Sequence, residues 1–330
     1  MAGECCDKND KPQKLNFSFT DYLKSLYCWI FSFKKTYSVK PGLYFTGDEY
    51  DINLPVLVTC NYHLTVFLLW RKIRKIKTRI LIIDTKGINV WCSSGKGQFS
   101  AKEILKVISA YEPSQLSKGK KLELILPKLS LSGVSLTELK KNFVKPIIGP
   151  VYMKSIPEYL KNQKYEDCAE DKYKFNLKDR LFTLVPSSLQ FLKYIFNICL
   201  AIFVFNHFKP IGIYWQPFIL GILICILYIV LFPILPTKKF AIKGISLAVL
   251  ILFSFFALDR LDLINLVLLD KIFYSLFTLG TSIWFGLYYT GSSGVSSYSL
   301  VKKEITLFLP VAFFVLLSSL VILVIKGFLN

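Results

Sequence analysis

The stretch between Asp84 and Gly97 carries the residues best suited to chemistry. It reads Asp-Thr-Lys-Gly-Ile-Asn-Val-Trp-Cys-Ser-Ser-Gly-Lys-Gly, with Trp91 and Cys92 side by side. A cysteine sulfur is a soft metal ligand and, as a thiolate, a strong nucleophile. The glycines around it allow a backbone to approach a large ligand closely. This segment therefore indicates a ligand-binding loop built around Cys92.

The residues alone leave several interpretations of this loop open. A phosphate-binding loop requires Ser or Thr after the lysine, whereas Gly97 follows Lys96, so the pattern disfavours nucleotide binding. A catalytic cysteine would need a base, and His63 is the one histidine in the first half of the sequence. A buried cysteine in a tight turn, without chemistry, fits equally well.

Cysteine and histidine usage disfavours a metal cluster built by this chain. The sequence has 8 Cys and 2 His, and no two cysteines form a CxxC pair. Iron–sulfur and zinc sites need several such ligands at short spacing. We therefore expect no iron–sulfur cluster in this chain.

Composition and charge describe a partly membrane-embedded protein with a basic soluble part. Of 330 residues, 53% are hydrophobic and 19% charged. The first 188 residues hold 31 basic and 18 acidic side chains, a surplus of 13. The basic stretch from Arg71 to Arg79 has no aromatic residues interleaved for base stacking, which favours a solvated or membrane-facing helix over nucleic-acid binding.

From Pro55 to Lys161, buried strands alternate with helices. The strands are expected at Pro55–Thr59, Ile80–Asp84, Leu122–Leu126 and Val144–Ile148, and the helices at 64–76, from Ser100, at 134–141 and at 156–161. Such alternation predicts an α/β fold with a mainly parallel sheet covered on both faces. Ligands bind at the carboxyl ends of such strands. The loops expected there are 59–61, 84–98, 127–133 and 149–151.

Five apolar segments follow a charged linker. The pattern of the linker allows a short strand near 173–177. The five apolar segments are Leu189–Asn206, Trp215–Leu235, Phe240–Leu258, Ile272–Tyr289 and Ile305–Ile325. Each is close to the roughly 20 residues that cross a bilayer. Lysines gather in the second and fourth loops, so the positive-inside rule predicts a cytoplasmic N-terminal domain and an outside C-terminus in the inner membrane. A shorter apolar run, Leu26–Phe33, fits either an interfacial contact or packing on the soluble domain.

The segment Asn89-Val-Trp-Cys-Ser-Ser-Gly-Lys-Gly97 resembles the cap-helix signature of the mercury-methylating corrinoid protein family, and the five apolar segments resemble that family's architecture. Further similar pieces are Pro41–Tyr44, Val56–Tyr62, Asp84–Gly87, Leu126-Pro127 and Gly149-Pro150. The large subunit of the corrinoid iron–sulfur protein of the acetyl-CoA pathway is a more distant likeness. The resemblance implies a Rossmann-like corrinoid-binding domain with a cap helix, followed by an all-α transmembrane domain of five helices. The implied domains are an extension (1–38), the corrinoid domain (39–164), a linker (165–188) and the transmembrane domain (189–330).

The resemblance also implies a site. Cys92 would be the lower axial ligand of the corrinoid (cobalamin-type) cobalt, Trp91 would pack on the macrocycle or pin the cap helix, and Asn89 would fix its turn. Ser93 and Ser94 replace the family's small apolar pair, and a hydrogen bond from either hydroxyl to the Cys92 sulfur would weaken its donation. The implied cofactor-binding residues are Thr59, Asn61, Asp84, Thr85, Asn89, Val90, Trp91, Cys92, Ser93, Gly95, Lys96, Gly97, Pro127, Gly149 and Pro150.

The function implied by the resemblance is a corrinoid-dependent methyltransferase that converts Hg(II) to methylmercury. Its implied partners are a ferredoxin with two [4Fe–4S] clusters, a donor protein that supplies a methyl group derived from methyl-folate, and the lipid bilayer. Two alternatives stay open: a corrinoid carrier in one-carbon metabolism with another acceptor, such as a thiol or another metal or metalloid, and a membrane protein whose corrinoid domain is degenerate.

Overall fold

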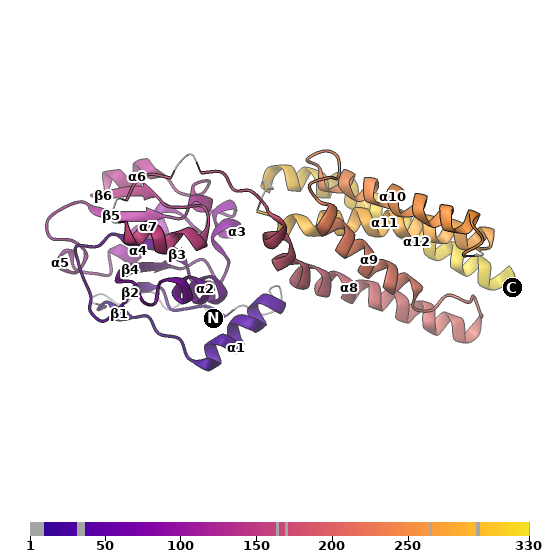
Figure 1. Cartoon of the computed structure of the whole chain (residues 1–330), viewed down its shortest axis with the longest axis horizontal. Helices are drawn as coiled ribbons and strands as arrows, with labels where there is room; N and C mark the ends of the chain where they lie inside the picture. The colour runs from indigo at the N-terminus through magenta and orange to yellow at the C-terminus, as the bar shows by residue number, and fades with distance from the viewer. Residues whose placement is uncertain are drawn as a thin grey trace. The chain divides into compact units, whose positions relative to one another are not determined.

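The computed structural model describes residues 10–31, 37–162, 165–168, 171–264, 266–294 and 298–329. The chain divides into two compact units, Met1–Lys174 and Phe175–Asn330. The first is an α/β unit and the second consists of helices (Figure 1). Cys5 and Cys6, for which the sequence suggests no role, lie outside the described residues.

A six-stranded sheet forms the centre of the first unit, in the order β1-β2-β4-β3-β5-β6. Its strands are β1 (Gln13–Lys14), β2 (Gly42–Thr46), β3 (Val56–Cys60), β4 (Thr78–Ile83), β5 (Leu122–Leu126) and β6 (Val144–Ile148). All neighbouring pairs are parallel except β2 with β4, which is antiparallel. The sheet is therefore mixed but mostly parallel, and β2 and β1 add an edge that the sequence pattern did not predict.

Helices cover both faces of this sheet because successive strand residues point to opposite sides. On one face, alternate residues such as Leu57 and Ile80 pack with α2 (His63–Ile73) and α7 (Ile156–Lys161). On the other, residues such as Val58 and Leu81 pack with α4 (Ala101–Ile108) and α6 (Leu136–Lys141). The unit also contains α1 (Phe19–Ile30), α3 (Val90–Gly95), α5 (Pro113–Leu116), η1 (Lys128–Ser130) and η2 (Met153–Ser155).

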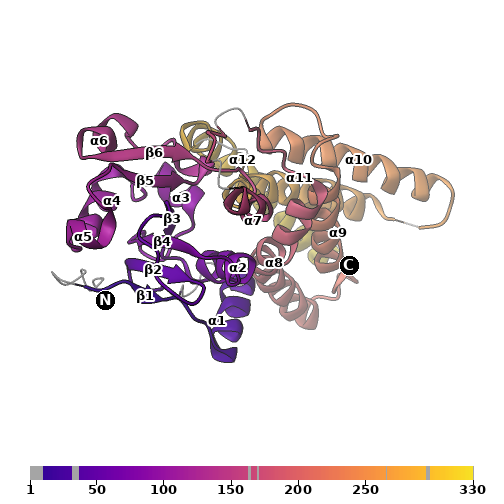
Figure 2. The same ribbon diagram turned by 60° about the vertical axis from the view of Figure 1, so that its left-hand side comes forward.

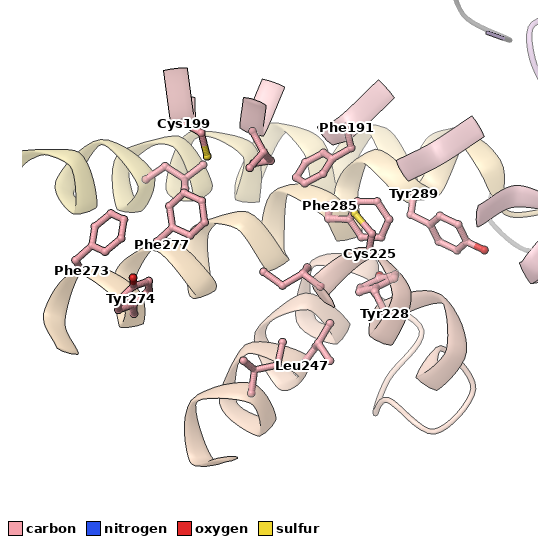
Figure 3. Packing of buried hydrophobic residues seen from close by; sticks show 14 of the residues in the cluster. Phe191, Cys199, Cys225, Tyr228, Leu247, Phe273, Tyr274, Phe277, Phe285 and Tyr289 are labelled. Atoms are coloured by element: carbon pink, nitrogen blue, oxygen red, sulfur yellow. The ribbon is translucent and has the colours of Figure 1, made fainter. Parts of the chain in front are cut away.

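Five helices form the second unit, namely α8 (Leu177–Phe208), α9 (Gln216–Leu231), α10 (Phe240–Arg260), α11 (Leu268–Tyr289) and α12 (Tyr298–Leu329), with a short η3 (Thr290–Ser292). α8 begins inside the segment predicted to be a linker, and no strand forms among residues 171–176. Figure 3 shows the core, in which Phe273, Phe277, Phe285 and Tyr289 all come from α11. Gly244 of α10 allows a close approach to α11, since an added Cβ would lie 2.3 Å from the Ser282 carbonyl oxygen.

Three helices of the described part, not the five predicted, are long and apolar enough to cross a membrane: Leu177–Phe208, Phe240–Arg260 and Leu300–Leu329. Helix α9 has 16 residues and so covers only about 24 Å of the ~30 Å hydrocarbon core. Helix α11 is longer but buries polar side chains, including Thr278, Thr281 and Ser282, against its neighbours. The prediction of five spans rested on the apolar runs alone, whereas α9 is too short and α11 carries buried polar side chains.

Two buried cations donate hydrogen bonds to carbonyl oxygens at and just beyond the end of α9. The Arg180 guanidinium donates to the carbonyl oxygens of Ile229 (2.8 Å) and Val230 (2.7 Å). Lys243 Nζ donates to those of Phe232 and Leu235 at 2.7 and 2.6 Å. The last carbonyls of a helix lack intrahelical partners and carry partial negative charge. Cations from α8 and α10 therefore stabilise the point where α9 stops.

Candidate functional site

Four loops meet at the carboxyl edge of the parallel strands. They follow β3, β4, β5 and β6, which run in one direction, so their ends lie together. Gly149 after β6 donates its amide to the Leu126 carbonyl at the end of β5 (2.9 Å), which joins two of these loops. In Figure 2, α3 lies beside the ends of β3 and β5. The edge predicted to bind a ligand is therefore formed as the sequence indicates.

Asn61 organises the loop that leads from β4 to α3. Its Oδ1 accepts hydrogen bonds from the Thr85 amide (3.0 Å) and the Gly87 amide (3.0 Å). The Thr85 hydroxyl lies 2.9 Å from the same oxygen and 2.7 Å from the Ile88 carbonyl oxygen, and its one hydrogen is donated to one of them at a time. Its Nδ2 donates to Asp84 Oδ1 (3.0 Å). Asn61 and Thr85 are buried, and Lys86 and Gly87 both have positive φ. One side chain thus holds a turn whose backbone would otherwise be strained.

Helix α3 starts with a side-chain cap from Asn89. The Asn89 Oδ1 atom accepts a hydrogen bond from the Cys92 backbone amide (2.8 Å). An N-cap of this kind satisfies one of the free amides of the first turn. Asn89 fixes this turn by the side-chain-to-backbone bond that the sequence suggested, and this bond holds the backbone of Cys92.

Ser93 and Ser94 turn toward the protein interior, not toward the Cys92 sulfur. The Ser93 hydroxyl donates to the carbonyl oxygen of Asn89 (2.6 Å). The Ser94 hydroxyl donates to the Ser130 carbonyl oxygen in η1 (2.8 Å). The hydrogen bond to sulfur considered from the sequence is therefore wrong, because both hydroxyls are engaged elsewhere. Instead, Ser94 fastens α3 to the loop after β5.

A glycine makes this fastening possible. A Cβ added at Gly133 would lie 2.6 Å from the Phe99 carbonyl oxygen and 2.7 Å from that of Ser94. Real Cβ atoms do not approach so closely, so any side chain there would push α3 away from the loop. Gly133 therefore sets how near α3 lies to the strand ends.

The Cys92 thiol is half-buried at the start of α3. Burial raises its pKa above the ordinary value, although Lys96 and a hydrogen bond from Asn89 act in the opposite direction. The thiol is therefore protonated at neutral pH. A soft metal ion that bound the sulfur would release this proton, so such binding strengthens as the pH rises.

The remaining predicted site residues fall into an exposed and a buried group. Trp91 is half-buried, and Gly95, Lys96 and Gly97 are exposed at the end of α3. Val90 packs on the core, and Pro127 and Pro150 are half-buried in their loops. Thr59, by contrast, is buried inside β3. The structure thus brings most of these residues to one edge of the sheet, while Thr59 presents no surface there.

Two neighbours of this site were missed by sequence reasoning. Gln98 follows α3, and its buried Oε1 has no hydrogen-bond partner within the described ranges. The Tyr62 hydroxyl donates to the Cys28 carbonyl (2.9 Å), and burial, with the nearby Cys28, Cys60 and Cys92 thiols, raises the Tyr62 pKa well above its usual range. The sequence offered no signal for Gln98, while Tyr62 lay in a segment already noted for its likeness to a known family.

The geometry suits neither a catalytic cysteine with His63 as its base nor a phosphate-binding loop around Lys96. His63 contacts Ser25 Oγ through Nδ1 (3.0 Å) and Asp21 through Nε2 (3.5 Å), so its ring is engaged by α1 and not by Cys92. Burial lowers its pKa. Lys96 caps the C-terminal end of α3, whereas phosphate loops place their lysine at a helix N-terminus. The arrangement favours a ligand-binding role for Cys92.

The metal-ligating side chains near Cys92 fit a metal ion that is already held by a macrocyclic cofactor. Among the described residues, no three His, Cys, Asp or Glu side chains lie close enough together to hold a metal ion. Cys92 offers a half-exposed sulfur on α3, and a corrin would bring a cobalt ion already held by its own ring nitrogens. The unpartnered Gln98 Oε1 would accept an N–H from an amide-bearing ligand. These features fit a corrinoid better than a free ion.

The raised pKa gives a first prediction. In cofactor-free protein, we expect alkylation of Cys92 by iodoacetamide to be half-maximal at a pH above the ordinary thiol value, because only the thiolate reacts. Lys96→Gln should move this midpoint higher, since the Lys96 charge favours the thiolate. Lys102→Gln, on the exposed side of α4, should leave it unchanged. Peptide mass spectrometry across pH measures each midpoint, and a midpoint below the ordinary value would contradict the geometry.

Comparison with known proteins gives one local similarity. No family model matches the chain. Over 72 residues, the chain is 42% identical to the acetyl-CoA decarbonylase/synthase complex subunit gamma of Methanopyrus kandleri. This stretch is 21% of the present chain, which covers only 15% of that subunit's length. Over these residues, the chain is similar to part of one subunit of a multi-subunit complex.

Proposed function

We propose that the first unit is a Rossmann-like corrinoid-binding domain and that the protein is a membrane-anchored, corrinoid-dependent methyltransferase that delivers methyl to Hg(II). The observation that carries this proposal is the presentation of Cys92. A six-residue helix, fixed at both ends, leaves one sulfur half-exposed at the carboxyl edge of a mostly parallel sheet. The local similarity to a subunit of an acetyl-CoA decarbonylase/synthase complex supports the same class of chemistry.

A bound corrinoid supplies a cobalt ion that carries the methyl group to be transferred. Cys92 is the residue that would hold this cobalt, as a thiolate formed by loss of the proton from Sγ. A thiolate is a stronger and softer donor than an imidazole or water, and so suits transfer to a soft acceptor such as Hg(II). The raised pKa of the thiol keeps the sulfur unreactive until the metal binds it.

The other residues of the edge position this sulfur or surround the cofactor. Asn61 and Asn89 hold the loop and the first turn of α3. Ser94 and Gly133 set the distance between α3 and the strand ends. The exposed Lys96, at the end of the helix, is placed to meet an amide or phosphate group at the periphery of the ligand.

The activity needs partners that this chain does not provide. A ferredoxin with two [4Fe–4S] clusters is the proposed source of the electrons that corrinoid-dependent methyl transfer would require. A donor protein that carries a methyl group derived from methyl-folate is the proposed source of methyl. Neither partner is identified by the similarity to the acetyl-CoA decarbonylase/synthase subunit, although that subunit does belong to a complex.

The contacts within the second unit support the proposed orientation. Arg180 near the start of α8 meets the end of α9, and Glu304 in α12 accepts a hydrogen bond from the Ala241 amide at the start of α10 (3.1 Å). The loop lysines at 238 and 239 and the lysines at 302 and 303, near the start of α12, therefore belong to one end of this unit. By the positive-inside rule that end faces the cytoplasm of an inner membrane, with the C-terminus outside.

The local similarity to the acetyl-CoA decarbonylase/synthase subunit is also compatible with a second candidate function, a corrinoid methyl carrier whose acceptor is not Hg(II). One experiment separates the two. The protein, purified without oxygen, is examined by absorption spectroscopy for a bound corrinoid and then supplied with a reduced ferredoxin, a methyl donor and Hg(II). We expect a stoichiometric corrinoid with a sulfur-ligated spectrum, and formation of methylmercury. Corrinoid without methylmercury would favour the second candidate, and protein without corrinoid would contradict both.

A further inference from the structure

Helix α1 carries its apolar residues on the outside. Phe19, Tyr22, Leu23 and Leu26 are 74, 46, 50 and 39% exposed. These positions are three and four residues apart, which places them on one face of a helix. A helix on the surface of a soluble domain normally buries that face, so α1 is oriented in the opposite way.

The buried face of α1 carries polar contacts from Asp21 and Ser25, with the Cys28 side chain in the hydrophobic core beside them. Ser25 donates to or accepts from His63 Nδ1 (3.0 Å), and Asp21 meets His63 Nε2 (3.5 Å). The Cys28 carbonyl oxygen accepts a hydrogen bond from Tyr62 (2.9 Å). Hydrogen bonds to Asp21, together with the Lys24 charge, lower the carboxyl pKa despite partial burial, so this ion stays charged. Polar contacts thus fix α1 with its apolar side turned outward.

A row of basic side chains adjoins this apolar face. Helix α1 lies alongside α2 (Figures 1 and 2). The Tyr22 ring contacts Phe67 of α2 with centroids 6.1 Å apart, and the Arg71 guanidinium lies 5.9 Å from the Phe67 centroid. Further along α2, Arg74 lies over Trp70. Lys72 and Lys75 are exposed beside them.

We propose that α1 and the basic edge of α2 form a second membrane contact, which binds the surface of an anionic phospholipid bilayer. An outward apolar face beside exposed cations is the chemistry of an interfacial helix, whose apolar residues enter the boundary of the acyl chains while the cations meet lipid phosphates. The same chain contains three helices long and apolar enough to cross a membrane, which would tether the first unit to a bilayer. This inference does not depend on the corrinoid proposal.

The test uses the full chain reconstituted into vesicles of phosphatidylcholine with about 30% phosphatidylglycerol, a content at which interfacial basic residues bind strongly. An environment-sensitive fluorescent amino acid replaces Leu23, and a matched protein carries it at Thr137, an exposed polar position on α6. We expect brominated lipids to quench the label at position 23 at least about threefold more than at 137, because only position 23 lies on the apolar face of α1.

Charge reversal in the basic edge provides the second arm. Arg71→Glu with Arg74→Glu should reduce quenching at position 23 in anionic vesicles to the level seen with phosphatidylcholine alone. Lys102→Glu with Lys140→Glu, exposed sites on α4 and α6, should leave it unchanged. Circular dichroism of each protein verifies folding. A label at position 23 that stays water-exposed in anionic vesicles, or becomes buried only after another protein is added, would overturn the proposal.

Discussion

Replacement of Cys92 by alanine should abolish methylmercury formation, with a rate loss of more than about 100-fold, since loss of a metal ligand costs at least as much as loss of the groups that orient it. The fold should persist, because this thiol is half-buried and donates no hydrogen bond that the loop requires. The bound corrinoid should remain detectable but lose its sulfur-ligated absorption spectrum. Activity and spectrum are measured on the same anaerobic preparation.

Cys168→Ala provides the matched control for this experiment. Cys168 is also half-buried and free, so it is comparably open to Hg(II), but it lies in the segment after α7, where its amide bonds to the Ile148 carbonyl oxygen at the end of β6, and not on α3. We expect full activity and an unchanged spectrum. If Cys92→Ala retained methyl transfer, or if both variants lost it equally, sulfur ligation from position 92 would be refuted and simple capture of mercury by thiols would be the better explanation.

Replacement of Asn61 by leucine should destabilise the site more than any other single change in the loops. It would leave the Thr85 and Gly87 amides without their acceptor, while the Thr85 hydroxyl would keep the Ile88 carbonyl oxygen. Each buried donor left unpaired costs about 1–3 kcal/mol, so the local free energy of opening should fall by about 2 kcal/mol or more. Native-state hydrogen exchange of the peptides from Asp84 to Phe99 measures this directly.

Asn53→Ala is the corresponding control. Asn53 is exposed and bonds only to the neighbouring Asp51, so its loss should change exchange in residues 84–99 very little. Asn61→Asp tests the charge of the same network, because it would place a carboxylate beside Asp84 Oδ1, now 3.0 Å from Asn61 Nδ2. Its destabilisation should be greatest at neutral pH and decrease as the carboxyls become protonated in acid. Unchanged exchange in Asn61→Leu would show that the loop is held by other contacts.

The parallel strands could be predicted because each is a short run of buried apolar residues with a polar loop after it. Strands β5 and β6 have the predicted bounds, and β3 and β4 differ by one or two residues at either end. Strand β2 was missed because Gly42–Thr46 acquires its role only by pairing with β4, more than thirty residues away. Local patterns report what a segment buries, not which distant strand completes the sheet.

The site was predictable in its location and not in its details. The glycine-rich segment after a buried strand identified the Cys92 loop, but the direction of the Ser94 hydroxyl depends on η1, which is formed some thirty-six residues later. Helix α1 escaped notice for a different reason. Its apolar residues face outward, so the sequence looked like a short hydrophobic run and not like a helix packed by its polar side.

The short helix α9 has a consequence for how the second unit is made. Its last carbonyls accept hydrogen bonds from Arg180, synthesised before it, and those of Phe232 and Leu235 just beyond it accept from Lys243, synthesised after it. A nascent chain that ended at Leu235 would lack the second of these donors, and a buried backbone oxygen without a partner is costly. The end of α9 is therefore complete only when α8 and α10 have both packed against it, after residue 243 has been synthesised.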